Sequence, residues 1–226
     1  MREGDSGEEK LKIKEETTMQ KLTLLPRAEN NYRTQEEAIT FHNQRGEPMC
    51  SVADALALEG QDIGSIRIDF NGVFMSSSRF DYNPKDLSGT LTHNFGSTIV
   101  KPTVFKLKEI PVCRPTYFKE LVKTDAGLEL ARAFAKKPKA TKEQLEKAFV
   151  SLSGKKIEDI RFWTPTPEQR ISKPVRPVRL CFIYGRLDVF GDYWFNDNGL
   201  SRGMTLGICQ TTNDHETTQR NLSEDV

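Results

Sequence analysis

The chain has 226 residues, of which 36% are hydrophobic, 9% aromatic and 29% charged, and these proportions exclude a fibrous or disordered chain. No apolar run approaches the length of a membrane span, which excludes a membrane-spanning protein. The first residues also lack the apolar core of a signal peptide, so we expect a cytoplasmic protein with no membrane partner.

The net charge of +1 conceals a separation of charge along the chain. Residues 101–180 carry 19 Lys and Arg against 9 Asp and Glu, whereas the rest of the chain carries 14 against 23. A basic segment of this size indicates an anionic partner, and nucleic acid is the commonest one. The alternative is that the acidic and basic parts fold against each other and neutralise much of the field.

The N-terminal third predicts a tail, a strand and two short helices. Residues 1–18 are polar and have no apolar periodicity, which favours a disordered tail. A first strand is predicted over residues 20–25, and Pro26 ends it. Thr34 is expected to cap a helix over residues 35–42, and Ser51 to cap a second one.

The next segment alternates between apolar and polar residues, which is the period of a strand. This alternation predicts strands at 66–75, 91–100 and 105–108, and a loop over 76–87 that contains the breaker Asn83-Pro84. Their spacing favours antiparallel pairing.

Residues 115–162 have helical spacing and are expected to form a helical insertion. Within it, Thr141 and Gln144 have the form of a capping box. Helices joined by a turn at Gly154 would resemble a helix-turn-helix over 141–162. Its phosphate contacts would be Lys142, Lys147, Lys155, Lys156 and Arg161. The following segment, residues 163–177, contains four prolines and is predicted to be an extended surface linker.

Residues 178–210 hold the densest run of apolar and aromatic residues and predict a three-stranded antiparallel meander. Its aromatic residues favour a core role over base stacking, since few basic residues lie beside them. Residues 211–226 are expected to be a disordered tail. The predicted fold is therefore α+β, a single domain over 19–210 in which an antiparallel sheet carries the helical insertion on one face.

The residues that usually carry catalysis or bind metals are scattered. The four cysteines include no CxxC pair, and buried free thiols are the expectation. The three histidines, at positions 42, 93 and 215, are isolated and are interpreted as structural. Standard phosphate-loop, hydrolase and zinc-protease motifs are absent, so no cofactor or metal is predicted. Only Asp188, Asp192 and Asp197 cluster, and they support a weaker alternative, a small metal-dependent hydrolase.

The basic segment therefore favours a non-enzymatic accessory protein that binds nucleic acid through phosphate. A structural or regulatory protein that docks on another protein, or on a second copy of itself, is the alternative, with 163–177 and the acidic ends as docking surfaces. The residues expected to contact nucleic acid are Lys136, Lys137, Lys139, Lys142, Lys155, Lys156, Arg161, Arg170, Lys173, Arg176 and Arg179.

Overall fold

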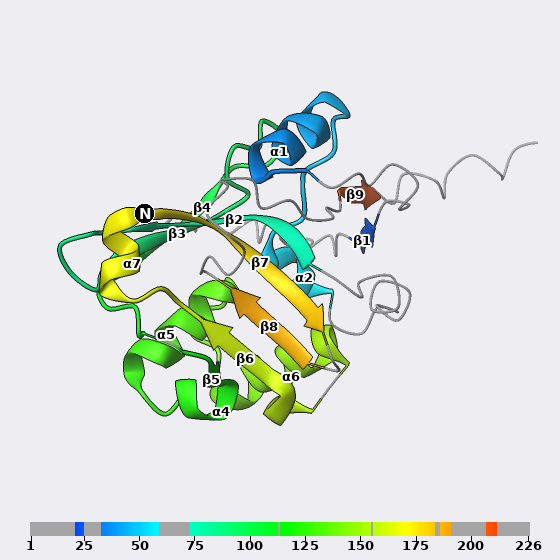
Figure 1. Ribbon diagram of the computed structural model, residues 1–226. Helices are drawn as coiled ribbons and strands as arrows, with labels where there is room; N and C mark the ends of the chain where they lie inside the picture. The colour runs from blue at the N-terminus through cyan, green and yellow to red at the C-terminus, as the bar shows by residue number, and fades with distance from the viewer. Residues whose placement is uncertain are drawn as a thin grey trace, which may run out of the picture.

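A curled, mixed sheet forms the centre of the molecule (Figure 1). The computed structural model describes residues 21–24, 33–58, 73–112, 114–154, 156–183, 186–190 and 207–211. In these residues the sheet has seven strands in the order β4-β3-β2-β7-β8-β6-β5. The strands are β2 (Val73–Tyr82), β3 (Gly89–His93), β4 (Thr103–Leu107), β5 (Thr116–Tyr117), β6 (Ile160–Trp163), β7 (Val175–Ile183) and β8 (Arg186–Phe190). The α+β class is confirmed.

The expectation of a purely antiparallel sheet is wrong, because β6 and β8 pair in parallel. The chain leaves β6, returns through a helix and β7, and then turns back into β8. Since β7 and β8 are antiparallel, β8 runs in the same direction as β6 and fits between β6 and β7.

The predicted three-stranded meander is also corrected. Its third strand, β9 (Ile208–Thr211), pairs with β1 (Lys21–Leu24) in a separate two-stranded sheet. The reason is that β8 already has β7 on one edge and β6 on the other, so neither edge is free for a further strand. The strand predicted near residue 20 is confirmed as β1. The predicted tail 211–226 begins one residue too early, since Thr211 belongs to β9. Residues 1–18 and 212–226 lie outside the described residues.

The helices begin where the sequence places their caps. Thr34 and Ser51 cap α1 (Gln35–Gln44) and α2 (Val52–Ala57), each with a complete capping box. The helical insertion consists of α4 (Phe118–Leu121), α5 (Asp125–Phe134) and α6 (Lys142–Ser153), and Thr141 with Gln144 forms the predicted capping box of α6. Within the described residues no helix combines the length and apolar character needed to cross a bilayer.

The helix-turn-helix predicted over 141–162 does not form. Gly154 ends α6 in the left-handed conformation, and only a single 3-10 turn, η2 (Ile157–Asp159), follows before β6. Ile160 and Phe162 are buried while their neighbours Arg161 and Trp163 are only partly buried. This alternation is the period of a strand, and it was misread as part of a helix.

The segments predicted as a linker and as a loop are also ordered. Residues 163–177 contain α7 (Pro167–Ser172), which Thr166 caps with Gln169, and Pro167 takes the first helical turn where its missing N–H costs nothing. The strand β2 runs through Tyr82 and so includes most of the predicted loop. Its register shifts between Met75 and Arg79.

Gln35, a polar residue of α1, makes it possible to bury the part of β2 where the register shifts. The Gln35 side-chain amide donates to the carbonyls of Ser76 and Ser78, at 2.8 and 2.9 Å. These hydrogen bonds satisfy backbone groups that the irregular ladder leaves open, since an unpaired buried carbonyl would be costly.

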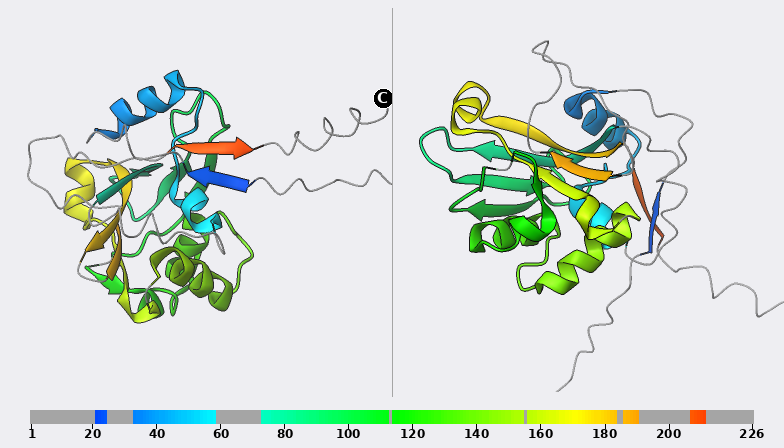
Figure 2. Two further views of the ribbon diagram at one scale, coloured as in Figure 1. Left: turned by 90° about the vertical axis from the view of Figure 1, so that its right-hand side faces the viewer. Right: turned by 60° about the horizontal axis from the view of Figure 1, so that its bottom comes forward.

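One large core lies between the sheet and helices α2, α4, α5 and α6, while α1 lies at the opposite end of the molecule from α4, α5 and α6 (Figures 1 and 2). Phe134 of α5 and Phe149 of α6 pack around Phe162 of β6, with ring centroids 5.7 and 5.3 Å from it. A smaller cluster joins α1 to β2 through Ile39 and Met75. The large core fixes how α5 and α6 lie against each other and on the sheet.

Candidate nucleic-acid interface

The predicted basic residues separate into a surface group and an interior group. Lys136, Lys137, Lys139 and Lys142 are exposed and lie together along the connection from α5 to α6. Lys156 is exposed before η2, and Lys173 is partly buried after α7. Lys155 lies outside the described residues. The lysines at the α5–α6 connection are therefore the only ones of the predicted set, within the described chain, that cluster in one short segment.

The arginines of the set point inward. Arg170 is 1% exposed and donates to the carbonyls of Pro165 and Ile110. Arg176 is 3% exposed and donates to the carbonyls of Lys173 and Gln169, and Arg179 is 4% exposed. Buried guanidinium groups of this kind stabilise loops and helix ends, so these three arginines are not available for phosphate at the surface.

Of the three clustered aspartates, only Asp188 lies within the described residues, and it forms an ion pair with Arg161. The Arg161 Nε and one terminal nitrogen donate to the two carboxylate oxygens of Asp188, both at 2.7 Å, and this pair raises the pKa of Arg161. Asp192 and Asp197 lie outside the described residues. Among the residues that are described, no group of three or more His, Cys, Asp or Glu side chains could hold a metal ion.

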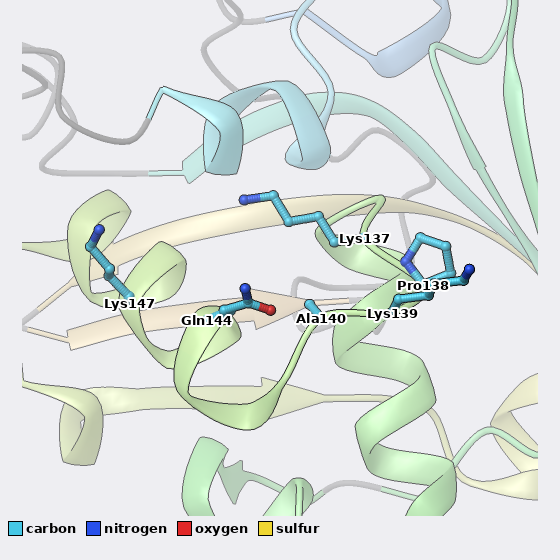
Figure 3. Close-up of a pocket in the computed structure, with 6 residues that line it drawn as sticks. All are labelled: Lys137, Pro138, Lys139, Ala140, Gln144 and Lys147. Atoms are coloured by element: carbon cyan, nitrogen blue, oxygen red, sulfur yellow. The ribbon is translucent and has the colours of Figure 1, made fainter.

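A hollow of about 630 Å³ opens at the α5–α6 connection (Figure 3). We call it the basic hollow, and it is lined by Lys137, Pro138, Lys139, Ala140, Gln144 and Lys147. Among the described residues that line it, three are lysines and none is acidic, so the described lining carries positive charge. Gln144 and Lys147 share one face of α6 because they are three positions apart in the helix, and Figure 3 shows the Lys137 side chain extending toward that side.

The backbone that carries these lysines is fixed by local hydrogen bonds. At the end of α5, Lys136 takes the left-handed conformation with φ 55°, and its N–H donates to Ala133 O at 3.1 Å. The Lys137 N–H donates to Arg132 O at 3.0 Å, which completes a Schellman motif. The Arg132 side chain then donates to Ala140 O at 2.9 Å. The loop is held at both of its ends.

The start of α6 lies at the edge of the basic hollow. Thr141 Oγ1 accepts the N–H of Gln144, and Gln144 Oε1 accepts the N–H of Thr141 at 2.9 Å. The helix dipole favours anions at this end. The Glu143 carboxylate of the first turn already uses this preference, because hydrogen bonds from its own backbone N–H and from Thr141 lower its pKa. The positive charge at the hollow therefore comes from the lysines.

A buried histidine of β3, His93, forms a hydrogen bond with the last turn of α5, next to the lysine loop. His93 Nε2 lies 2.8 Å from Ala133 O, and its Nδ1 lies 2.7 Å from Ser78 Oγ. A carbonyl only accepts, so Nε2 carries the hydrogen and Nδ1 accepts from the Ser78 hydroxyl. Burial lowers the pKa of His93, which keeps the ring neutral. His93 is a structural histidine, as expected from the sequence.

Among the other predicted structural groups, His42, Cys50 and Cys181 are described and buried, whereas Cys113, His215 and the Cys209 side chain lie outside the described residues. Burial, with Arg33 and Arg45 nearby, lowers the pKa of His42 to about 4. Cys50 and Cys181 are buried free thiols, and burial raises the pKa of Cys181 to about 11. These environments disfavour a thiolate nucleophile at either cysteine.

The sequence reasoning predicted Lys137 and Lys139, and it assigned Lys147 only to the helix-turn-helix that does not form. Pro138, Ala140 and Gln144 were not predicted. The spacing of Gln144 and Lys147 on a helix that Thr141 caps was the signal that could have placed both beside the loop. Comparison with known protein families, curated proteins and solved structures found no match to this chain.

Proposed function

We propose that this protein is a non-enzymatic accessory protein that binds nucleic acid, and that the basic hollow receives backbone phosphates. The observation that carries the proposal is that Lys137, Lys139 and Lys147, and no carboxylate, stand among the described residues that line the hollow. Lysine ammonium groups bind phosphate as compact point charges and do not require one fixed geometry. Such contacts position a nucleic acid without reading its bases.

The fixed loop strengthens this proposal. Because the Schellman motif and the Arg132 contact already order the backbone, binding orders only the lysine side chains. The entropic cost of binding is correspondingly smaller. Lys136 and Lys142 are exposed and lie beside the lining residues in the sequence, so we count them with the same surface. We therefore expect roughly three to five phosphates to be neutralised, which is a small interface.

Fluorescence anisotropy with labelled single- and double-stranded DNA and RNA tests the proposal. With three to five phosphate contacts, affinity should fall about 40- to 500-fold between roughly 50 and 200 mM salt. The triple variant Lys137→Glu, Lys139→Glu, Lys147→Glu should abolish binding at the lower salt. A matched control, Lys85→Glu, Lys101→Glu, Lys108→Glu, changes the net charge equally at exposed positions outside the hollow and should keep most of the affinity.

The control makes the outcome specific to the hollow. Equal losses in the two triple variants would mean that only the overall charge matters and would reject the basic hollow as the site. No binding of any of the four nucleic acids at roughly 50 mM salt would reject the proposed function, and docking on another protein would then be the interpretation to pursue.

A further inference from the structure

We infer that His93 is a positioning residue of the basic hollow, tying the last turn of α5 to the sheet and thereby fixing the backbone from which Lys136 and Lys137 project. This inference deepens the proposed function and rests on it for the binding measurement alone. The hydrogen-bond geometry that carries it is independent of any ligand.

The contact lies at the base of the lysine loop. Ala133 O accepts from His93 Nε2 at 2.8 Å, and the same carbonyl accepts the N–H of Lys136 at 3.1 Å. His93 belongs to β3, at the register position opposite Thr103 of β4. The ring therefore connects the sheet directly to the carbonyl from which the Schellman motif is built. No other side chain bonded to Ala133 O is seen among the described hydrogen bonds.

A second contact fixes which nitrogen of the ring donates. The Ser78 hydroxyl donates to Nδ1, and Ser78 Oγ in turn accepts the N–H of Val52 at the start of α2, at 3.0 Å. With its lone pair occupied in this way, Nδ1 cannot carry the hydrogen of the neutral ring. Ser78 therefore orients His93, and it also satisfies one of the N–H groups at the start of α2.

The ring acts through its N–H and not through its charge. His93 and Ser78 are both fully buried at 0% exposure. The charged groups that act on His93 are Asp54 of α2, which favours the protonated ring, and Lys136, which opposes it. Burial outweighs both, so the neutral ring with its hydrogen on Nε2 is the form present at neutral pH.

Two substitutions of His93 test the roles of its two ring nitrogens separately. In glutamine the amide nitrogen lies three bonds from Cβ, as Nε2 does in histidine, so His93→Gln keeps a donor for Ala133 O. In asparagine the amide oxygen lies two bonds from Cβ, as Nδ1 does, so His93→Asn keeps an acceptor for Ser78 and loses the reach to Ala133 O. Both variants remove the imidazole and both leave a neutral amide.

We expect the amide hydrogens of Lys136 and Lys137 to exchange faster in His93→Asn than in the wild type, and to stay near wild-type protection in His93→Gln. Binding of a labelled single-stranded oligonucleotide should weaken roughly two- to tenfold in His93→Asn. Its salt dependence should keep the wild-type slope because no charge is lost. Lys137→Ala, in contrast, should reduce that slope by about 1.

A control variant and a direct measurement complete the test. Met75→Ala destabilises the separate cluster beneath α1 and should leave exchange at Lys136 and Lys137 unchanged. Nitrogen-15 NMR of the wild-type ring should show the hydrogen on Nε2, and this measurement needs no variant to fold. A hydrogen on Nδ1, or equal exchange in His93→Asn and the wild type, would overturn the inference. Failure of the wild type to bind any oligonucleotide would reject only the proposed function.

Discussion

Lys136 occupies a backbone conformation that suits glycine better than lysine. Its φ of 55° lies in the left-handed region, at the position of the Schellman motif where glycine is most common. The cost for a residue with a Cβ is of order 1 kcal/mol. With lysine at this position the protein is less stable than it would be with glycine, but it gains a positive charge beside the basic hollow.

This cost leads to a paired prediction for Lys136. Lys136→Gly should raise the free energy of unfolding by about 0.5–1 kcal/mol and weaken oligonucleotide binding, since the strain and one charge are both removed. Urea denaturation and anisotropy measure the two effects. Lys139→Ala is the control, because it removes a charge from a residue without a positive φ and should weaken binding without a comparable gain in stability.

The lowered pKa of His42 predicts that the folded protein loses stability in acid. The pKa of His42 in the folded protein is about 4, whereas an unfolded histidine titrates near 6.5. As pH falls below about 6.5 the unfolded chain gains a proton that the folded chain does not, so stability is lost between pH 6.5 and 4. The loss attributable to His42 should be about 2–3 kcal/mol, and His93 adds to it in the same direction.

Chemical denaturation at a series of pH values tests this sensitivity. His42→Gln cannot titrate, so its stability should fall less than that of the wild type between pH 6.5 and 4.5. Parallel curves for the two proteins would show that His42 is accessible to protons in the folded state.

The sequence predicted the role of a residue well when that role depends only on neighbours in the chain. Thr34, Ser51 and Thr141 were predicted as caps because a cap is decided by neighbours a few residues away. The inward turn of Arg170 could not be predicted, because its acceptor Ile110 O is 60 residues distant in the chain. Composition counts a buried arginine and an exposed one as the same positive charge.

Among the elements, β6 and β8 are joined by the ion pair of Arg161 and Asp188, whose side chains are only 14% and 10% exposed. Asp188→Asn should reduce the free energy of unfolding by about 3 kcal/mol, because it leaves the Arg161 charge largely buried without its partner. The double variant Arg161→Met, Asp188→Leu should be more stable than Asp188→Asn. A double variant that is less stable than the single one would show that the charges themselves are required.

Gly127 shows how closely α5 approaches the turn before it. A Cβ at this position would lie 1.9 Å from Leu121 O. Helix propensity alone predicts that Gly127→Ala adds about 1 kcal/mol of stability. The clash with backbone predicts instead a loss of about 1–3 kcal/mol or more. The sign of the change in thermal or urea denaturation decides between them.

Element prediction succeeded for α1, α2, α5 and α6, whose caps are local. It failed for α7, which was predicted as a linker, for the segment after Gly154, and where long-range pairing decides. The strand β2 was missed beyond Met75 because Ser76, Ser77 and Ser78 are polar, and their burial depends on contacts such as that of Gln35, more than 40 residues away. The parallel pairing of β6 with β8 has no local signature. The α5–α6 lysines were predicted, but their concave arrangement follows from packing on the core.

Across the whole molecule the net charge is only +1, so attraction of a nucleic acid must be local. At physiological salt, charges separated by more than about 8 Å are largely screened. Glu143 lies beside Gln144 on α6, whereas Glu36 lies on α1 at the opposite end of the molecule (Figure 1). An acidic residue should therefore weaken oligonucleotide binding only if it lies close to the basic hollow.

Glu143→Gln should strengthen oligonucleotide binding about two- to threefold, because it removes a repulsive, solvent-screened charge beside the hollow. Glu36→Gln changes the net charge by the same amount and should have no measurable effect. Equal gains in the two variants, measured by anisotropy at about 150 mM salt, would indicate a diffuse field and not a local site.

The position of the β7–β8 hairpin determines when the sheet can be assembled during synthesis. Strands β4, β3 and β2 form one half of the sheet and β6 with β5 the other, and only this hairpin joins them. Because β8 follows every other strand of this sheet in the chain, both halves emerge from the ribosome with an open edge. The edge of β2 is closed when β7 emerges, whereas the edge of β6 stays open until β8, the last of the seven strands, arrives. Unpaired strand edges are the kind of surface that exposes a folding chain to aggregation, so β6 is the strand that depends longest on protection during synthesis.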